Sequence, residues 1–113
     1  MKLGSRLREL RKAKGYTLRE LAARVDVGFT YLCKIETAKL DRGHTPSDAL
    51  LHKLADELDG DEDELLILSD RVPRKIHQRI VKRHKDFLEL AGLDDDELSL
   101  VMEIVRDSNF TAS

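Results

Sequence analysis

The stretch TLRELAARVDVGFTYLCKIE, residues 17–36, decides the fold of this chain because it holds two short helical patterns separated by one turn signal. Thr17 can cap the first helix, and Glu20 three residues later completes a capping box. The turn signal is Asp26-Val27-Gly28, and the second helix is expected from Phe29 to about Thr37. Helices this short are unstable in isolation, so the stretch predicts that both pack against other helices.

The remainder of residues 1–70 supplies those other helices. Leucines at helical spacing precede the stretch, and Gly15 supplies a stop for a first helix. After the stretch, Thr45-Pro46-Ser47-Asp48 predicts the start of a fourth helix, with the threonine as N-cap and the proline at the first helical position. Asp61 followed by Glu64 predicts the start of a fifth. Because no segment alternates with a period of two residues, we expect an all-α domain of five short helices.

Residues 71–113 are predicted to form a separate helical extension. Its first part is expected to be one helix with a break near His84, ended by Gly92. Asp94 and Glu97 then give the N-terminal signal of a last helix. One apolar face of that helix consists of Leu98, Val101, Met102 and Val105. Such a face can serve as core or as interface, and we favour a homodimer interface.

Charge is distributed unevenly along the chain, although the net formal charge is only -2. Residues 1–40 hold ten Lys or Arg against four Asp or Glu. Residues 41–70 hold two against ten, and residues 71–113 hold eight against eight. A basic block beside an acidic one predicts an anionic partner for the first block.

Several classes of protein are disfavoured by the composition. A single cysteine excludes an intramolecular disulfide and suits the reducing cytoplasm, and no apolar run approaches the roughly 20 residues of a membrane span. No nucleophile–base arrangement or phosphate-cradling glycine-rich loop is present, so we expect neither an enzyme nor a bound cofactor. No metal site is expected either, because the histidines do not form a zinc-site spacing with Cys33.

The opening stretch resembles the helix-turn-helix of the Cro and phage-repressor class of DNA-binding proteins. The resemblance runs from Leu3 to about Leu68 and includes LRELRKAKG before the stretch and PSDALLHKLADELDGDEDELL after it. Within the stretch it rests on T-x-x-E-L-A in the first helix and on I-E at the end of the second. The resemblance implies a five-helix lambda-repressor-like domain whose second helix of the pair enters the major groove of double-stranded DNA.

The same resemblance implies roles for individual residues. Base contacts are expected from the start of the second helix of the pair and from one residue a turn later, which are Gly28, Phe29, Thr30, Tyr31 and Lys34. Phosphate contacts are expected from Thr17, Arg19, Thr37, Lys39 and Arg42. The class also pairs an arginine of the first helix with the glutamate that ends the second helix of the pair, here Arg11 and Glu36. That pair would orient the helix without reading bases.

The two aromatic residues of the second helix have alternative interpretations. Phe29 could belong to the core, but Leu32 and Ile35 already define the inward face, so we favour an exposed Phe29 that can pack against a thymine methyl. The hydroxyl of Tyr31 could reach a phosphate, or its ring could cover the helix pair.

Three positions depart from the pattern of the class. Asp26 stands where a glycine is common, and an aspartate accepts the left-handed conformation there at some strain. Leu18 replaces a frequent glutamine, which removes one side-chain contact to phosphate. Thr37-Ala38 replaces a usual Asn-Gly, and the loop after it is long.

Together these features predict a sequence-specific transcriptional regulator in the cytoplasm, most simply a repressor that binds a palindromic operator as a homodimer. The alternative is an antitoxin or another protein-interaction module whose C-terminal helices bind a partner protein.

Overall fold

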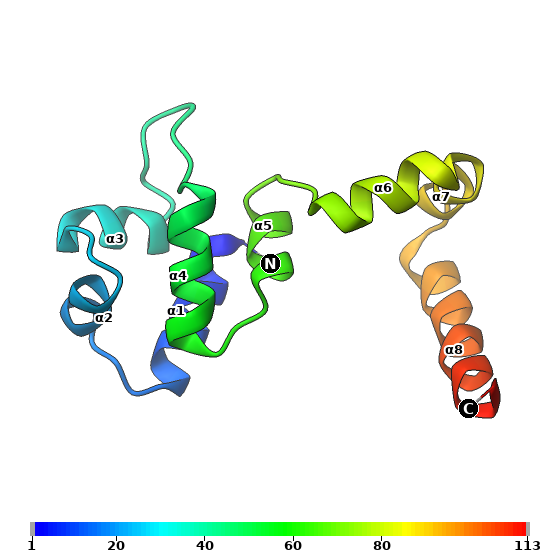
Figure 1. The fold of residues 1–113 in the computed structure, drawn as a ribbon, viewed down its shortest axis with the longest axis horizontal. Helices are drawn as coiled ribbons and strands as arrows, with labels where there is room; N and C mark the ends of the chain where they lie inside the picture. Colours follow the sequence, from blue (N-terminus) through cyan, green and yellow to red (C-terminus); the bar gives the residue numbers. More distant parts are fainter. Residues whose placement is uncertain (1, 113) are drawn as a thin grey trace. The chain divides into compact units, whose positions relative to one another are not determined.

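The computed structural model describes residues 2–112, and the backbone of this range forms eight α-helices and no β-strand (Figure 1). The helices are α1 (Leu3–Ala13), α2 (Leu18–Arg24), α3 (Phe29–Glu36), α4 (Asp48–Leu58), α5 (Glu62–Leu68), α6 (Arg74–Lys82), α7 (His84–Ala91) and α8 (Asp95–Ala112). The contacts divide the chain after Pro73 into unit 1, which holds α1–α5, and unit 2, which holds α6–α8. The prediction of an all-α fold with five helices and a helical extension is confirmed.

Leucine makes up most of the core of unit 1, which also contains Ala22, Val25, Ile35 and Ala55. Each of its five helices contributes at least one leucine with no exposed surface, and these are Leu7, Leu21, Leu32, Leu51, Leu54 and Leu65. Burying one such side chain contributes about 2 kcal/mol, so helices too short to persist alone are held by their shared core. Among the described residues, the core contains no buried polar or charged side chain.

Gly4 lets α1 approach the C-terminal end of α3 closely. A Cβ atom built at this position would lie 2.4 Å from the carbonyl oxygen of Glu36 and 2.6 Å from that of Ile35. No real Cβ tolerates such distances, so a glycine is required here. The close contact fixes where α3 ends relative to α1.

Four helices of unit 1 end in a left-handed residue that is not glycine. These residues are Asp26, Ala38, Asp59 and Asp70, with φ between 50° and 62°. After α2, for example, Asp26 N–H donates to the Ala23 carbonyl at 3.3 Å and Val27 N–H donates to Ala22 at 3.0 Å. This pair of bonds is a Schellman motif, which favours glycine at its left-handed position.

The start of α4 differs from the prediction. Its N-cap is Ser47, whose hydroxyl accepts from the Leu50 N–H at 3.1 Å. The prediction that Thr45 caps this helix was wrong. The Thr45 hydroxyl instead accepts from the Arg71 guanidinium at 3.0 Å. Pro46 is buried before the cap and is not the first residue of the helix.

Unit 2 has a thin interior. α6 packs on α7, and Ile76, Ile80 and Phe87 are only half-buried. Among its described side chains none is fully buried. The expected break in the first helix lies at Arg83, between α6 and α7. None of the helices in the described part of the chain is long and apolar enough to cross a membrane.

Candidate functional site

The helix pair α2–α3 is fixed at its start by a reciprocal cap. The Thr17 hydroxyl accepts from the Glu20 N–H at 3.1 Å, and the Glu20 carboxylate accepts from the Thr17 N–H at 3.1 Å. Hydrogen bonds from the Thr17 N–H and from the Thr17 hydroxyl to the Glu20 carboxylate lower the pKa of Glu20. The cap satisfies two backbone N–H groups and orients the positive end of α2 toward solvent, where a phosphate can be bound.

The turn between the two helices is compact. Asp26 takes the left-handed conformation with φ of 58°, the conformation for which the class uses glycine. Gly28 is the N-cap of α3 with φ of -68°, and nothing lies within 4 Å of a Cβ built there. A side chain at position 28 would therefore meet no other atom of the monomer, and packing within the monomer does not require glycine there.

The leading edge of α3, which we define as Gly28, Phe29, Thr30, Tyr31 and Lys34, faces solvent. Phe29 is 38% exposed and Tyr31 is 37% exposed. The opposite face of α3 is closed, since Leu32 and Ile35 are buried in the core. All five residues that the sequence proposed for base contact are therefore accessible to solvent.

Arg19 and Phe29 form a contact that sequence reasoning missed. The guanidinium carbon of Arg19, on α2, lies 4.3 Å from the centroid of the Phe29 ring on α3. The contact joins one expected phosphate-binding residue to one expected base-contacting residue across the turn. A cation above an aromatic face is attracted by the ring quadrupole, so Phe29 orients Arg19. The sequence signal that could have predicted this contact was an arginine and an aromatic residue ten positions apart on two adjoining helices.

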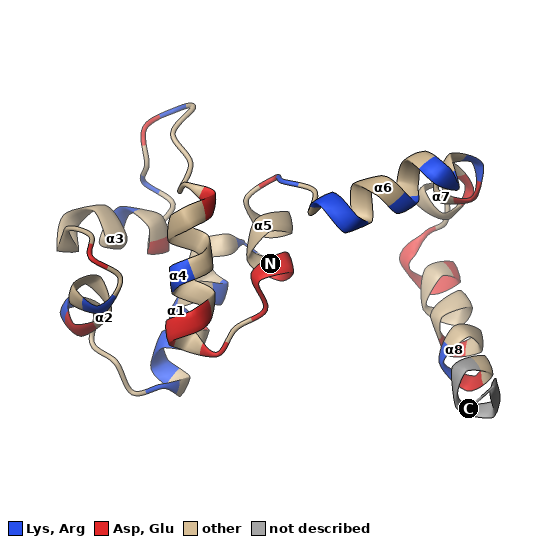
Figure 2. Cartoon of the chain, in the orientation of Figure 1, with Lys and Arg blue, Asp and Glu red and all other residues tan. Residues whose placement is uncertain are grey.

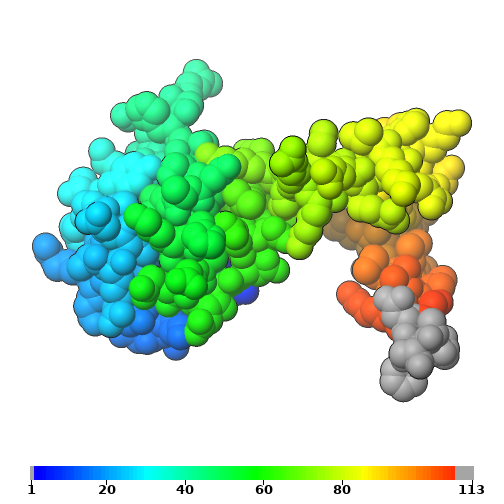
Figure 3. Space-filling view, viewed as in Figure 1, coloured from blue at the N-terminus to red at the C-terminus, as the bar shows by residue number. Residues whose placement is uncertain are grey.

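The residues proposed for phosphate contact are all exposed, and they are Thr17, Arg19, Thr37, Lys39 and Arg42. Lys39 and Arg42 follow α3 on the loop that leads to α4, which projects from the surface of unit 1 (Figure 3). The Thr37 hydroxyl donates to the Cys33 carbonyl at 2.8 Å, so its only proton is already used within the helix end. The Thr17 oxygen accepts in the cap, and its hydroxyl also helps to lower the pKa of Glu20 through a hydrogen bond to that carboxylate.

Arg11 and Glu36 are brought together across α1 and α3. Arg11 Nε lies 2.7 Å from Glu36 Oε2, and Nη2 lies 3.0 Å from Oε1, which makes a two-point contact. The third donor, Nη1, binds the Tyr16 carbonyl at 2.9 Å. The hydrogen bonds that Arg11 donates to Glu36 raise the pKa of Arg11, so the guanidinium stays charged. The pair anchors the C-terminal end of α3.

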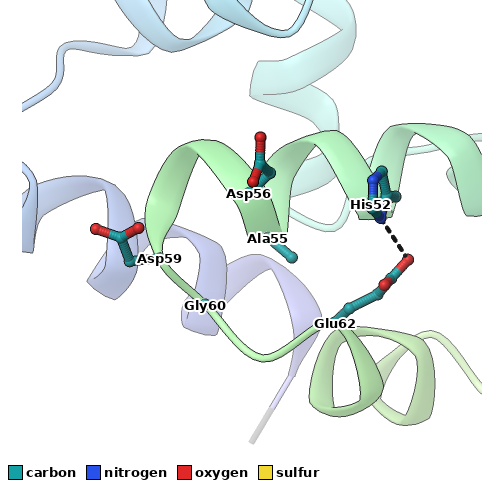
Figure 4. Close-up of a pocket in the computed structure, with 6 residues that line it drawn as sticks. All are labelled: His52, Ala55, Asp56, Asp59, Gly60 and Glu62. Carbon is teal, nitrogen blue, oxygen red and sulfur yellow. Dashed lines mark hydrogen bonds and ion pairs between the residues drawn. The ribbon is translucent and has the colours of Figure 1, made fainter.

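The acidic half of unit 1 lies on α4 and the start of α5. A hollow there is lined by His52, Ala55, Asp56, Asp59, Gly60 and Glu62. His52 Nδ1 lies 3.1 Å from Glu62 Oε1, whereas the carboxylates of Asp56 and Asp59 point in other directions (Figure 4). Because these groups do not converge, and no group of three or more possible metal ligands occurs among the described residues, the hollow has no arrangement for a cation.

The four residues proposed for a dimer interface lie on one side of α8. Leu98 is 38% exposed, Met102 37% and Val105 41%, and Val101 is half-buried beside Leu90 and Leu93 of the α7 end. Leu100 and Ile104, on the other side of the helix, are 61% and 66% exposed. The structure thus leaves apolar surface on two sides of α8.

Comparisons with known proteins identify relatives of residues 2–66. The helix-turn-helix domain family matches residues 2–66. The N-terminal DNA-binding domain of SinR from Bacillus subtilis is 38% identical, with a TM-score of 0.51 over 57% of this chain and 88% of that one. SinR, the master regulator for biofilm formation, in complex with DNA is also 38% identical, with a TM-score of 0.49 over 57% of this chain and 97% of that one.

A longer match includes unit 2. A chain of the SinR protein/SinI protein complex is 25% identical, with a TM-score of 0.53 over 95% of this chain and 97% of that one. A comparison with curated proteins found no match. The family match covers more than half of the sequence, and it confirms the resemblance of residues 17–36. This chain belongs to the helix-turn-helix domain family, in the Cro and phage-repressor class of DNA-binding domains.

Proposed function

We propose that this chain is a sequence-specific transcriptional regulator, a repressor that binds a palindromic operator as a homodimer. It acts in the cytoplasm on double-stranded DNA and catalyses no reaction. The observation that carries the proposal is the leading edge of α3, exposed on a helix whose other face is closed by the core. Such a helix fits the major groove, which is about 12 Å wide.

The proposed roles on the leading edge follow from side-chain chemistry. Lys34 can donate to guanine O6 or N7, and the Thr30 hydroxyl can donate or accept at a base edge. Arg19, held over Phe29, would bind a phosphate beside the groove, and Thr17 at the start of α2 would contact another. Lys39 and Arg42 add positive charge on the projecting loop. Base contacts would determine which DNA sequence is bound, and phosphate contacts would supply most of the affinity.

The homodimer is proposed because one recognition helix covers only a few base pairs. Two copies on half-sites about 34–36 Å apart would supply the missing affinity and specificity. Unit 2 is suited to join them, since it has no fully buried side chain among its described residues and carries exposed apolar side chains such as Leu100 and Ile104. Burial of that surface would stabilise both the unit and the dimer.

Selection of bound sites from random duplexes tests the DNA-binding proposal. A palindrome with half-sites one helical turn apart is the expected outcome. Sedimentation of the full chain tests the dimer. Met102→Asp should shift a dimer toward monomer, whereas Ser99→Asp, at an exposed polar position of the same helix, should not. Failure to enrich any sequence would contradict the regulator function.

A second function is favoured by the apolar surface of unit 2: an antitoxin or another interaction module whose C-terminal helices bind a different protein. The long match to a chain of the SinR protein/SinI protein complex supports a protein partner for this region. The two functions are compatible on one chain. A stoichiometric small protein that co-purifies with the full chain, and is lost when the chain is cut after Pro73, would identify the partner.

A further inference from the structure

The neutral segment 71–113 is divided into a basic half and an acidic half. Residues 71–85 contain seven Lys or Arg and no Asp or Glu. Residues 86–113 contain one Arg against eight Asp or Glu. Figure 2 shows Lys and Arg on α6 and at the start of α7, and mainly Asp and Glu among the charged residues from there on. Because α6 immediately follows the helix-turn-helix unit, the position of the basic half requires an explanation.

The charge of α6 lies on an open surface. Arg74, Arg79 and Lys82 are exposed, and within the described part of the chain none of them has an ion-pair partner. Ile76 and Ile80, one turn apart, are half-buried and mark the inner face. Arg79 and Lys82 are three residues apart and therefore share a face of the helix that excludes the two isoleucines. The helix presents unneutralised cations outward and apolar groups inward.

The chain that leads to α6 is held on unit 1. Arg71 Nε lies 3.1 Å from Asp48 Oδ1, and Nη2 donates to the Thr45 hydroxyl at 3.0 Å. Arg71 Nη1 also donates to the Ser69 hydroxyl at 3.2 Å. Only two residues separate Arg71 from the first residue of α6. A cationic helix is thus tethered by a short connection to the unit for which DNA binding is proposed.

We propose that α6 is a second DNA-contacting element, which binds backbone phosphates in the duplex that flanks the site read by α3. The proposal rests on the proposed function and extends it. Nine residues of α-helix are about 13 Å long, close to the length of four base pairs, along which a duplex carries roughly eight phosphates. Contacts of this kind carry no base specificity, so α6 would raise affinity without changing the preferred operator.

Duplex phosphate explains the charge of α6 better than another copy of this chain does. The acidic residues of α7 and α8 belong to the same unit as α6, so a second copy offers no anion that the first lacks. Yet Arg74, Arg79 and Lys82 remain without an acidic partner among the described residues. A dense, uniformly anionic surface is the partner that such a helix fits.

The test uses the full chain and two duplexes that share one selected operator. One duplex ends at the operator, and the other extends about ten base pairs beyond it on each side. The variant Arg74→Gln/Arg79→Gln/Lys82→Gln keeps good helix formers in α6 and removes three charges. The control Lys12→Gln/Lys53→Gln/Arg106→Gln removes three exposed charges from α1, α4 and α8. Affinity is measured against salt concentration, and self-association is measured by sedimentation.

The native chain and the control should bind the long duplex about tenfold or more tightly than the short one. The α6 variant should lose that gain, keep its base preference, and show a salt dependence shallower by about 0.9 for each phosphate contact removed. If all three proteins gain the same affinity from the longer duplex, the inference is overturned and the proposed function still stands. Equal weakening on both duplexes with loss of the dimer would also overturn it, by assigning α6 to self-association. A native chain without any site preference would instead overturn the proposed function itself.

Discussion

Arg11 in α1 holds Glu36, the last residue of α3, through two parallel hydrogen bonds of 2.7 and 3.0 Å. Their side chains are only 13% and 5% exposed, so the pair is largely screened from water. A two-point contact restrains rotation as well as distance, which a single bond does not. Together with the close approach at Gly4, it fixes the end of the helix opposite the leading edge.

Removing one partner of this pair should destabilise unit 1 by about 2–3 kcal/mol, because the other is left largely buried without its counter-ion. We expect Arg11→Met and Glu36→Gln each to lower the free energy of unfolding in chemical denaturation. The double variant should lose less than the sum, with a coupling of at least about 1 kcal/mol.

The Arg24–Glu57 pair serves as a matched control. Its atoms are 3.6 Å apart and its side chains are 50% and 31% exposed. The same cycle on this pair should give a coupling below about 0.5 kcal/mol. Equal coupling in the two cycles would show that Arg11 and Glu36 behave as an ordinary surface pair.

The left-handed residues at helix ends predict stabilising substitutions. Asp26→Gly and Ala38→Gly should each raise the free energy of unfolding by about 0.5–1 kcal/mol, since glycine adopts positive φ without steric cost. The reverse change at Gly15, where φ is 75°, should destabilise by a similar amount when alanine is introduced. Thermal melting of the three variants checks the sign of each effect, and destabilisation by Asp26→Gly would refute the strain assigned to the turn.

The cap of α2 predicts a dependence on pH. Its hydrogen bonds lower the pKa of Glu20, so they stabilise the fold above the pKa of the unfolded chain and are lost as pH falls through the lower folded value. A carboxyl NMR titration should find the pKa of Glu20 below its usual value in the native chain. In Thr17→Ala the pKa should move upward. An unchanged value in that variant would mean that the Thr17 hydroxyl does not bond to the Glu20 carboxylate in solution.

The contact of Arg19 with Phe29 predicts coupled effects on DNA binding. Phe29→Leu keeps an apolar group but removes the ring beneath the guanidinium, and should weaken binding about two- to fivefold, as the loss of a cation–π contact implies. In an Arg19→Gln background the same change should have little further effect. If Phe29→Leu instead alters the preference at one base pair in both backgrounds, Phe29 contacts a base directly and does not act through Arg19.

The sequence predicted the helices of unit 1 because their signals are local. The cap at Thr17, the stop at Gly15 and the leucine spacing each depend on neighbours a few residues away. The predicted start of α4 was wrong by two residues because Thr45 is bound by Arg71, which lies 26 residues further along the chain. A side chain that has two possible partners cannot be assigned from local spacing alone.

The exposure of the residues proposed for base contact could be predicted from the sequence, but their contacts could not. Helical periodicity was enough to place Thr30 and Lys34 outside the core, whereas their role in base contact is implied only by the resemblance. The stacking of Arg19 on Phe29 depends on the angle between α2 and α3, which Asp26 sets through its left-handed conformation. The bond from Thr37 to the Cys33 carbonyl likewise depends on a rotamer that sequence does not reveal.

Binding of a selected operator and of a scrambled duplex, by native chain and by Thr30→Ala/Lys34→Ala, tests the central claim most directly. Native protein should prefer the operator by about a thousandfold or more at moderate salt. The double variant should lose most of that preference while it still binds both duplexes through phosphates. Retention of the full preference by the variant would contradict the claim that the exposed edge of α3 reads DNA.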